Sequence, residues 1–252
     1  MIFDSHAHYL SSAFDQDREA LLTSLFNGKV SGIIESGTTV ADSREALTMA
    51  EQYPSMWAAV GIHPQEAATF CDTDIDALRD LASHPKAVAI GEIGLDYHYE
   101  DGAPRDIQHR CFRAQLELAR KTSLPVVIHD RDAHEDTLAI LKEYAPAGVV
   151  HCFSGSVEMA RDIIKLGMHI GIGGVVTFKN ARKLVEVASE IPLDRLLLET
   201  DAPYLAPVPL RGERCDSSMI VHTASTIAAL RGMSTDEILH LAEQNARRLY
   251  RL

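Results

Sequence analysis

Short apolar runs alternate with amphipathic stretches along the whole chain. Several runs, such as Val149-Val150 and Leu196-Leu197-Leu198, are almost wholly apolar, which is typical of strands in a sheet covered on both faces. The pattern predicts strands at residues 1–5, 32–36, 56–62, 87–93, 125–129, 148–152, 169–173 and 195–201.

Helical periodicity lies between these runs. It predicts helices at residues 17–27, 41–52, 74–83, 105–122, 133–144, 157–166 and 180–189. In the longest, Ile107, Cys111 and Leu116 belong to one apolar stripe. After a proline-rich loop, two more helices are expected at 218–230 and 235–249, the second preceded by the capping box Ser234-Thr235-Asp236-Glu237.

Eight strands, each followed by a helix or a helix-bearing loop, predict an α/β fold of the (β/α)8 TIM-barrel class. Such barrels commonly take about 250 residues and carry their chemistry at the C-terminal strand ends. A doubly wound open sheet is the alternative, but it would place the strand ends along a line rather than around a mouth. With no linker or low-complexity tract, residues 1–252 are expected to form a single domain with two C-terminal helices.

Composition narrows the function further. The formal net charge is −12, which argues against wrapping duplex nucleic acid by bulk electrostatics but allows a pocket where metal ions supply positive charge. The four cysteines are far apart and form no Cys-x-x-Cys pair, so a disulfide framework or thiolate zinc site is not expected. Without a signal-like or membrane-length apolar segment, we expect a cytoplasmic protein with no membrane contact, and no protein partner is inferred.

Potential metal ligands recur at the predicted strand ends. His6 and His8 follow the first strand and, two residues apart, point to the same side. The other strand-end candidates are His63, Glu92, His129, His151 and Asp201, after strands three, four, five, six and eight. In a barrel all of them converge on one rim, where unpaired buried charge would be costly. For His63 and His151 a hydrogen-bonded core histidine is the alternative.

The set is large enough for two divalent ions. We assign His6, His8 and Asp201 to one ion, His129 and His151 to the other, and Glu92 as the carboxylate that bridges them. His63 is a possible ligand or a neighbour of the site. The predicted catalytic residues are Asp201, as a general base or simply a ligand, and Glu92. The mixed nitrogen and oxygen donors leave Mg, Mn and Zn open.

Four further residues are candidates for supporting roles. Glu199 would hold a ligand histidine by its other ring nitrogen, or form an internal ion pair. Arg131 is placed to bind a phosphate or carboxylate with its planar fork, or to pair with Asp130 or Asp132. Lys179 and Arg211 follow strands seven and eight, where barrels often contact phosphate, although both could be ordinary surface charges.

Six strings match a known family in order: DSHAHY at 4–9, GIHP at 61–64, GEIGLDY at 91–97, HDRDA at 129–133, HCFSG at 151–155 and LLETDAPYLAP at 197–207. The chain resembles the TatD family of metal-dependent hydrolases over nearly its whole length. The resemblance implies a barrel of the amidohydrolase superfamily with one to three divalent ions, held by His6, His8, Glu92, His129, His151 and Asp201, with His63 close by. It also implies a deoxyribonuclease that trims single strands from the 3′ end.

Two departures from the family's usual pattern occur: the stretch Cys215-Asp216-Ser217 in the loop after strand eight, and Asp130 after His129. The expected substrate is therefore a nucleic-acid end or a small phosphoester. Amidohydrolase-type cleavage of a small amide, lactone or phosphoester is the alternative, and a non-catalytic metal-binding protein is the remote one. Glu92 stands where that superfamily often has a modified bridging lysine, which favours the phosphodiesterase.

Overall fold

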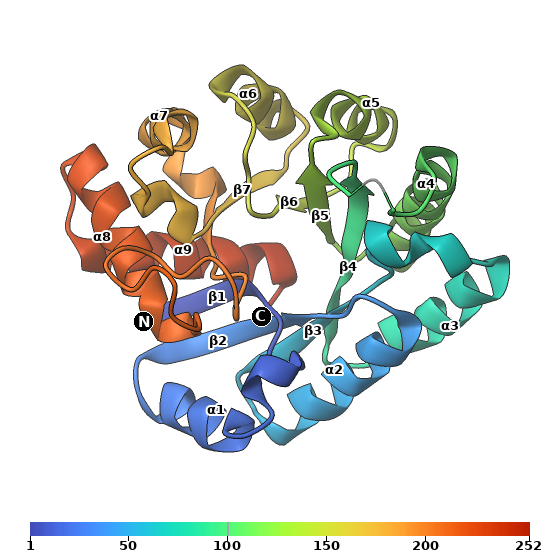
Figure 1. Cartoon of the computed structure of the whole chain (residues 1–252), viewed down its shortest axis with the longest axis horizontal. Helices are drawn as coiled ribbons and strands as arrows, with labels where there is room; N and C mark the ends of the chain where they lie inside the picture. The colour runs from blue at the N-terminus through green and yellow to red at the C-terminus, as the bar shows by residue number, and fades with distance from the viewer. Residues whose placement is uncertain (100) are drawn as a thin grey trace.

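The computed structural model describes residues 1–99 and 101–252. Within them, eight parallel strands form one sheet in sequence order (Figure 1). The strands are β1 (Ile2–Ala7), β2 (Val30–Ser36), β3 (Met56–Val60), β4 (Ala87–Asp96), β5 (Val126–Arg131), β6 (Gly148–Val150), β7 (His169–Ile172) and β8 (Leu196–Leu198).

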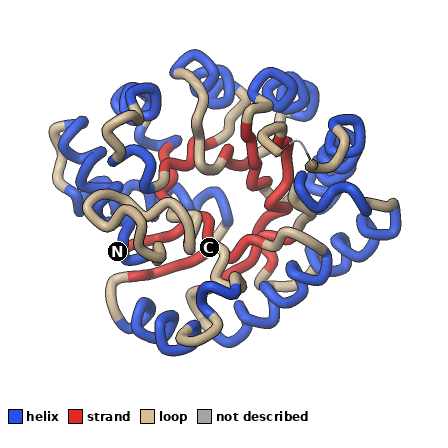
Figure 2. Tube along the Cα trace, viewed as in Figure 1, coloured by secondary structure: helices blue, strands red, loops and turns tan. Residues whose placement is uncertain are grey.

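Helices surround this sheet on the outside (Figure 2). They are α1 (Arg18–Asn27), α2 (Val40–Gln52), α3 (Asp72–Ala82), α4 (Arg105–Thr122), α5 (His134–Tyr144), α6 (Val157–Lys165), α7 (Arg182–Glu190), α8 (Ile220–Arg231) and α9 (Thr235–Tyr250). The predicted (β/α)8 class is confirmed, because each predicted strand has its counterpart and the two last helices follow β8. No helix in the described part of the chain is both long and apolar enough to cross a membrane.

The barrel closes where β8 meets β1. Ala7 and Ala202 form a parallel bridge, and the amide of Asp201 donates to the carbonyl of His6 at 3.1 Å. The buried carboxylate of Asp4 accepts hydrogen bonds from the Thr200 amide at 3.0 Å and the Thr200 hydroxyl at 2.6 Å. This seam holds the first and last predicted ligands side by side, although they are separated by almost the whole chain.

Helix α9 closes the opposite end of the barrel. Its residues Ala246 and Tyr250 pack in one apolar cluster with strand residues, namely Phe3, Ile34, Ala59, Val88, Ala89, Val127, Val149 and Leu197. The buried Asn245 side chain donates to the carbonyls of Leu193 at 2.7 Å and Leu196 at 2.9 Å. The barrel interior is therefore a packed core at the bottom and is open only at the C-terminal strand ends.

Three strands, β1, β4 and β5, extend beyond their predicted ends, and β4 extends farthest. β4 continues to Asp96, three residues past the predicted boundary, and pairs with β5 as far as Arg131. Gly94 has a φ of +147°, and a Cβ there would collide with the carbonyl oxygen of His129. Glycine thus allows the two strands to approach closely at the height of the predicted ligands.

Candidate metal centre

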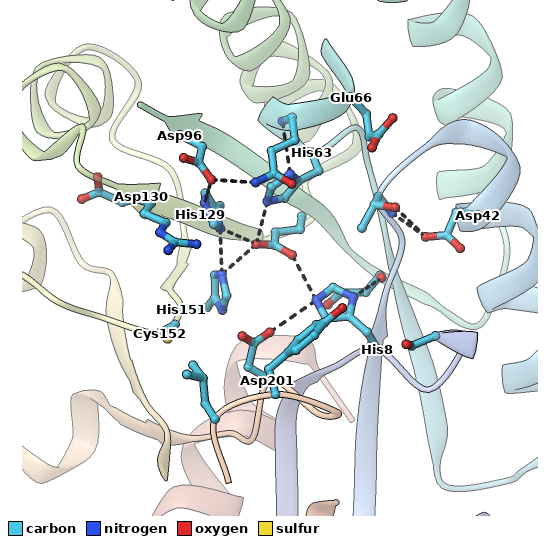
Figure 3. A pocket seen from close by; sticks show the side chains of 18 of the residues that line it. His8, Asp42, His63, Glu66, Asp96, His129, Asp130, His151, Cys152 and Asp201 are labelled. Carbon is cyan, nitrogen blue, oxygen red and sulfur yellow. Dashed lines mark hydrogen bonds and ion pairs between the residues drawn. The ribbon is translucent and has the colours of Figure 1, made fainter. Parts of the chain in front are cut away.

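The C-terminal strand ends open into a cavity of about 780 Å³ (Figure 3). Six of the seven predicted strand-end residues line it: His8, His63, Glu92, His129, His151 and Asp201. His6 is fully buried just beneath them, in contact with His8 and Glu92. The structure therefore brings all seven predicted side chains together at one rim.

Glu92 lies at the middle of the cluster and is 2 % exposed. Its Oε2 lies 3.3 Å from Nε2 of both His6 and His8. Its Oε1 lies 2.7 Å from His151 Nε2 and 2.8 Å from His129 Nδ1. The two oxygens of one carboxylate thus face two different groups of imidazoles, an arrangement that would allow the carboxylate to bridge two cations.

The first group consists of His6, His8 and Asp201. The two Nε2 atoms are 3.0 Å apart, and Asp201 Oδ1 lies 3.5 Å from each. His8 Nδ1 is 3.0 Å from the Ser36 carbonyl, which can only accept, so a neutral His8 ring presents an Nε2 lone pair to the centre. Asp201 has a φ of +64°, a strained backbone for a non-glycine residue and one that is frequent at functional sites.

The second group consists of His129 and His151. His129 Nε2 lies 3.1 Å from Asp96 Oδ2, so the neutral ring donates there and turns its Nδ1 lone pair towards Glu92. A lone pair and a carboxylate oxygen 2.8 Å apart repel each other unless a proton or a cation lies between them. The donor set therefore fits a metal ion, because imidazole nitrogens and carboxylate oxygens are ligands of Zn, Mn and Fe.

His63 is connected differently from the other histidines. Its Nδ1 accepts a hydrogen bond from the Gln65 amide at 3.2 Å, which places the proton of the neutral ring on Nε2. That Nε2 lies 3.4 Å from Glu92 Oε1. Burial lowers the pKa of His63, so the neutral form is favoured. His63 is therefore arranged to donate a hydrogen bond into the centre.

The electrostatics of the cluster are those of a cation site. Burial alone would raise the pKa of Glu92, but the surrounding imidazoles hold it well below the usual range. Burial alone would lower the pKa of His6 and of His129, yet the neighbouring carboxylates raise each to about 9. A carboxylate field that binds extra protons on these rings also attracts metal cations that replace the protons.

Glu199 lies below the cluster, as its strand position suggests. Its Oε1 is 3.7 Å from His151 Nδ1 and accepts a hydrogen bond from the Cys152 amide. His151 Nδ1 is buried and lacks a hydrogen-bond partner among the described residues. Burial raises the pKa of Glu199 to about 8, which favours its protonated form at neutral pH. We propose that Glu199 orients His151 through this ring nitrogen.

Sequence reasoning assigned no role to several residues that hold the site. Asp96 lies in the GEIGLDY string but carried no assignment. Gln115 of α4 accepts from the Ile62 amide at 2.7 Å and donates to the Ile62 carbonyl at 3.0 Å, next to His63. Gln108 makes the same pair of contacts with the backbone of Asp96, both at 2.9 Å. The only available signal was that both glutamines interrupt the apolar stripe of the longest helix.

The cationic candidates occupy different positions. Arg131 is exposed at the end of β5 and lines the cavity. Lys179 lies exposed in the turn before α7, and the Arg211 guanidinium lies over the Phe178 ring at 4.4 Å; neither lines the cavity.

The Asp130 carboxylate accepts from His134 Nδ1 at 2.7 Å, so it is paired with α5.

The unusual loop after β8 is attached to the barrel seam. Ser217 is fully buried, and its hydroxyl donates to Asp4 Oδ2 at 2.7 Å. The Ser217 amide donates to the Tyr9 hydroxyl at 2.9 Å. Ser217 therefore supports Asp4, which in turn holds the backbone next to Asp201, and it does not enter the cavity lining.

Comparison with known proteins agrees with this geometry. Residues 3–251 match the family model described as TatD related DNase. The chain is 44% identical to the uncharacterized metal-dependent hydrolase YabD of Bacillus subtilis, with all of both chains covered. It is 38% identical to the 3'-5' ssDNA/RNA exonuclease TatD of Musicola paradisiaca, covering 100% of this chain and 98% of that protein.

A solved structure of similar sequence has the same fold. The crystal structure of YJJV, a TatD homologue from Escherichia coli K12, superposes with a TM-score of 0.93 at 32% identity, covering 100% of this chain and 98% of the other. The match extends over the barrel and over the C-terminal helices that close it. The chain therefore belongs to the TatD family of metal-dependent hydrolases.

Proposed function

We propose that this hydrolase is a phosphodiesterase that uses two divalent metal ions, Mg, Mn or Zn, to remove nucleotides from the 3′ ends of single-stranded nucleic acid. The observation that carries this proposal is the division of ligands around Glu92, whose two oxygens face separate histidine groups. Relatives at 35–38% identity that are named 3'-5' ssDNA/RNA exonucleases support the substrate class.

The chain's own residues have distinct roles in this proposal. His6, His8 and Asp201 would hold one ion, His129 and His151 would hold the other, and Glu92 would serve both. A pair of ions held in this way supplies Lewis-acid chemistry, because it lowers the pKa of water and neutralises charge on a phosphoryl group.

Asp201 accepts the proton of the attacking water. Asp201 lines the cavity, and its side chain is 19% exposed, so that water can reach it. His63 donates from Nε2 to Glu92 or to a phosphoryl oxygen. Arg131 binds a phosphate at the cavity wall. Lys179 and Arg211 contact phosphates farther along the single-stranded nucleic acid.

The direct test uses purified protein loaded separately with Mg, Mn or Zn and a 5′-labelled single-stranded oligonucleotide. We expect stepwise shortening from the 3′ end, and a loss of about 100-fold or more in His129→Ala and in Asp201→Asn. His222→Ala on α8 is the matched control and should retain full activity.

The same assay distinguishes the proposed nuclease from the alternative, an enzyme that hydrolyses small substrates. If no metal supports oligonucleotide cleavage while small amides, lactones or phosphoesters are hydrolysed, the protein is an amidohydrolase-type enzyme of small substrates. If His129→Ala and Asp201→Asn shorten the oligonucleotide as fast as the wild type, the activity comes from a contaminant and the proposal fails.

A further inference from the structure

Two aromatic side chains are exposed at the mouth of the cavity. Tyr99, after β4, is 46% exposed, and Tyr204, after β8, is 58% exposed. Both line the cavity, and they are the only largely exposed aromatic side chains among residues 1–99 and 101–252. Large apolar surface left in water is costly, so two such rings at one opening indicate a surface that a ligand covers.

The Arg131 side chain lies against the ring of Tyr99. The Arg131 guanidinium carbon lies 5.2 Å from the ring centre, and an Arg131 terminal nitrogen donates to the Tyr99 hydroxyl at 3.3 Å. A planar guanidinium beside an aromatic ring combines a stacking surface with donors for a phosphate. A nucleotide offers a partner for each group, because its base has a π-face for the aromatic ring and its phosphate has anionic oxygens for the guanidinium.

The part of the mouth formed by the ends of β2 and β3 is acidic. Asp42 at the start of α2 and Glu66 after β3 line the cavity there and, as Figure 3 shows, lie on the far side of His63 and His8 from His151. Asp42 Oδ2 accepts from the Thr38 amide at 2.8 Å, and Glu66 is exposed. Carboxylates repel a phosphate chain, and Arg131 is the one Arg or Lys side chain among the described residues that line the cavity, so a phosphate is favoured beside Arg131 rather than at the ends of β2 and β3.

We infer that Tyr99 and Tyr204 stack on bases of the terminal nucleotides from opposite sides of the mouth, with Arg131 binding a phosphate beside Tyr99, so that the nucleic-acid strand crosses the mouth between the ends of β4 and β8. This inference rests on the proposed function, because it names how that site holds a single strand. Stacking on two rings is sequence-tolerant, since every base has a π-face, and a duplex end would have to fray to offer it.

The test removes the ring from the protein and the base from the substrate, singly and together. We compare Tyr99→Ala and Tyr204→Ala with Tyr99→Phe and Tyr204→Phe, on intact strands and on strands whose two 3′-terminal nucleotides are abasic. Binding is measured by fluorescence anisotropy with cleavage-resistant phosphorothioate strands, and cleavage as KM and kcat. Val221→Ala, an exposed apolar position on α8 outside the cavity, is the control.

We expect each alanine variant to weaken binding and raise KM about 5- to 100-fold on intact strands, with the phenylalanine variants within about 2-fold of the wild type. On abasic strands the alanine variants should equal the wild type, because the base that the ring contacts is already gone. Equal loss on intact and abasic strands, or no loss on either, would overturn the inference. Binding with this pattern but without cleavage would instead defeat the proposed function and leave the stacking contacts standing.

Discussion

Asp96 accepts a hydrogen bond from His129, with Oδ2 3.1 Å from Nε2, on the side of the ring opposite Glu92. In the neutral ring this contact holds the proton on Nε2, away from the cluster, and leaves the Nδ1 lone pair facing Glu92. The carboxylate is itself held by the Gln65 side chain, which donates to Asp96 Oδ2 at 3.1 Å. Asp96, to which the sequence assigned no role, thus selects the tautomer of the neutral His129 ring.

Replacement of Asp96 therefore tests whether its hydrogen bond to His129 strengthens metal binding by that ring. In Asp96→Asn the amide no longer favours the Nε2 proton, and we expect the affinity for the second ion to fall about 10- to 100-fold. Calorimetric metal titration of the metal-free protein measures it. Asp130→Asn, which removes a carboxylate paired with His134 instead, should leave the affinity unchanged; an equal loss in both variants would contradict the assignment.

Glu92→Gln tests the bridge. An amide offers one oxygen and turns an N–H group towards imidazole lone pairs or the second cation, so we expect metal content to fall from two ions to one or none, and activity by about 100-fold or more. Elemental analysis gives the stoichiometry. Glu199→Gln is the control, because a protonated carboxyl is well mimicked by an amide, and two ions should remain. Two ions bound to Glu92→Gln would exclude bridging.

His63 should act without binding metal. Because its Nδ1 accepts from the Gln65 amide, the ring offers a donor rather than a lone pair to the centre. We expect His63→Phe to keep two ions and to lower kcat about 100-fold, and His63→Gln to recover part of that loss through its amide donor. Metal analysis and kinetics on the same samples decide it: a drop to one ion in both variants would make His63 a ligand.

Gln115 couples helix α4 to the strand end that carries His63. Gln115→Leu would leave the buried amide and carbonyl of Ile62 without partners, and we expect a loss of about 1–3 kcal/mol in the free energy of unfolding. Urea denaturation measures the loss. The exposed Gln244→Leu on α9 should change stability by less than about 0.5 kcal/mol, and a similar result for Gln115→Leu would show that the backbone groups find other partners.

The contribution of His169 to stability should depend on pH, and this residue lies away from the candidate metal centre. Burial, helped by the nearby charge of Arg195, lowers the pKa of His169 to about 4, from an ordinary value of 6.5. The folded protein therefore binds fewer protons here than the unfolded chain between these values, so the contribution to stability is full above about pH 6.5 and is lost as the pH falls towards 4.

The matched variant is His169→Phe, which cannot titrate. From pH 7.5 to pH 5, the free energy of unfolding should fall by about 2 kcal/mol more in the wild type than in His169→Phe. Denaturant unfolding of both proteins measures this difference, from which any ligand titration common to both cancels. Parallel pH profiles would show that His169 does not keep its neutral form in the fold.

The sequence by itself determined the order of the elements and the strand ends at which the candidate ligands lie. Apolar runs such as 148–150 and 196–198 need burial on both faces, and that requirement alone predicts a parallel sheet with an outer layer of helices. His6, Glu92 and Asp201 could be named because a strand end in a barrel always faces the mouth. The local pattern of apolar and polar residues is sufficient to predict the elements and the residues at their ends.

Only the tertiary structure decided how those side chains face one another. Which oxygen of Glu92 meets which imidazole, and which nitrogen of His63 or His129 carries the proton, depend on partners such as Gln65 and Asp96 on other elements. Tyr99 and Arg131 likewise meet through the extended pairing of β4 with β5. Hydrogen bonds and charge interactions act over a few ångströms, and strand register and closure set those distances between residues far apart in the chain.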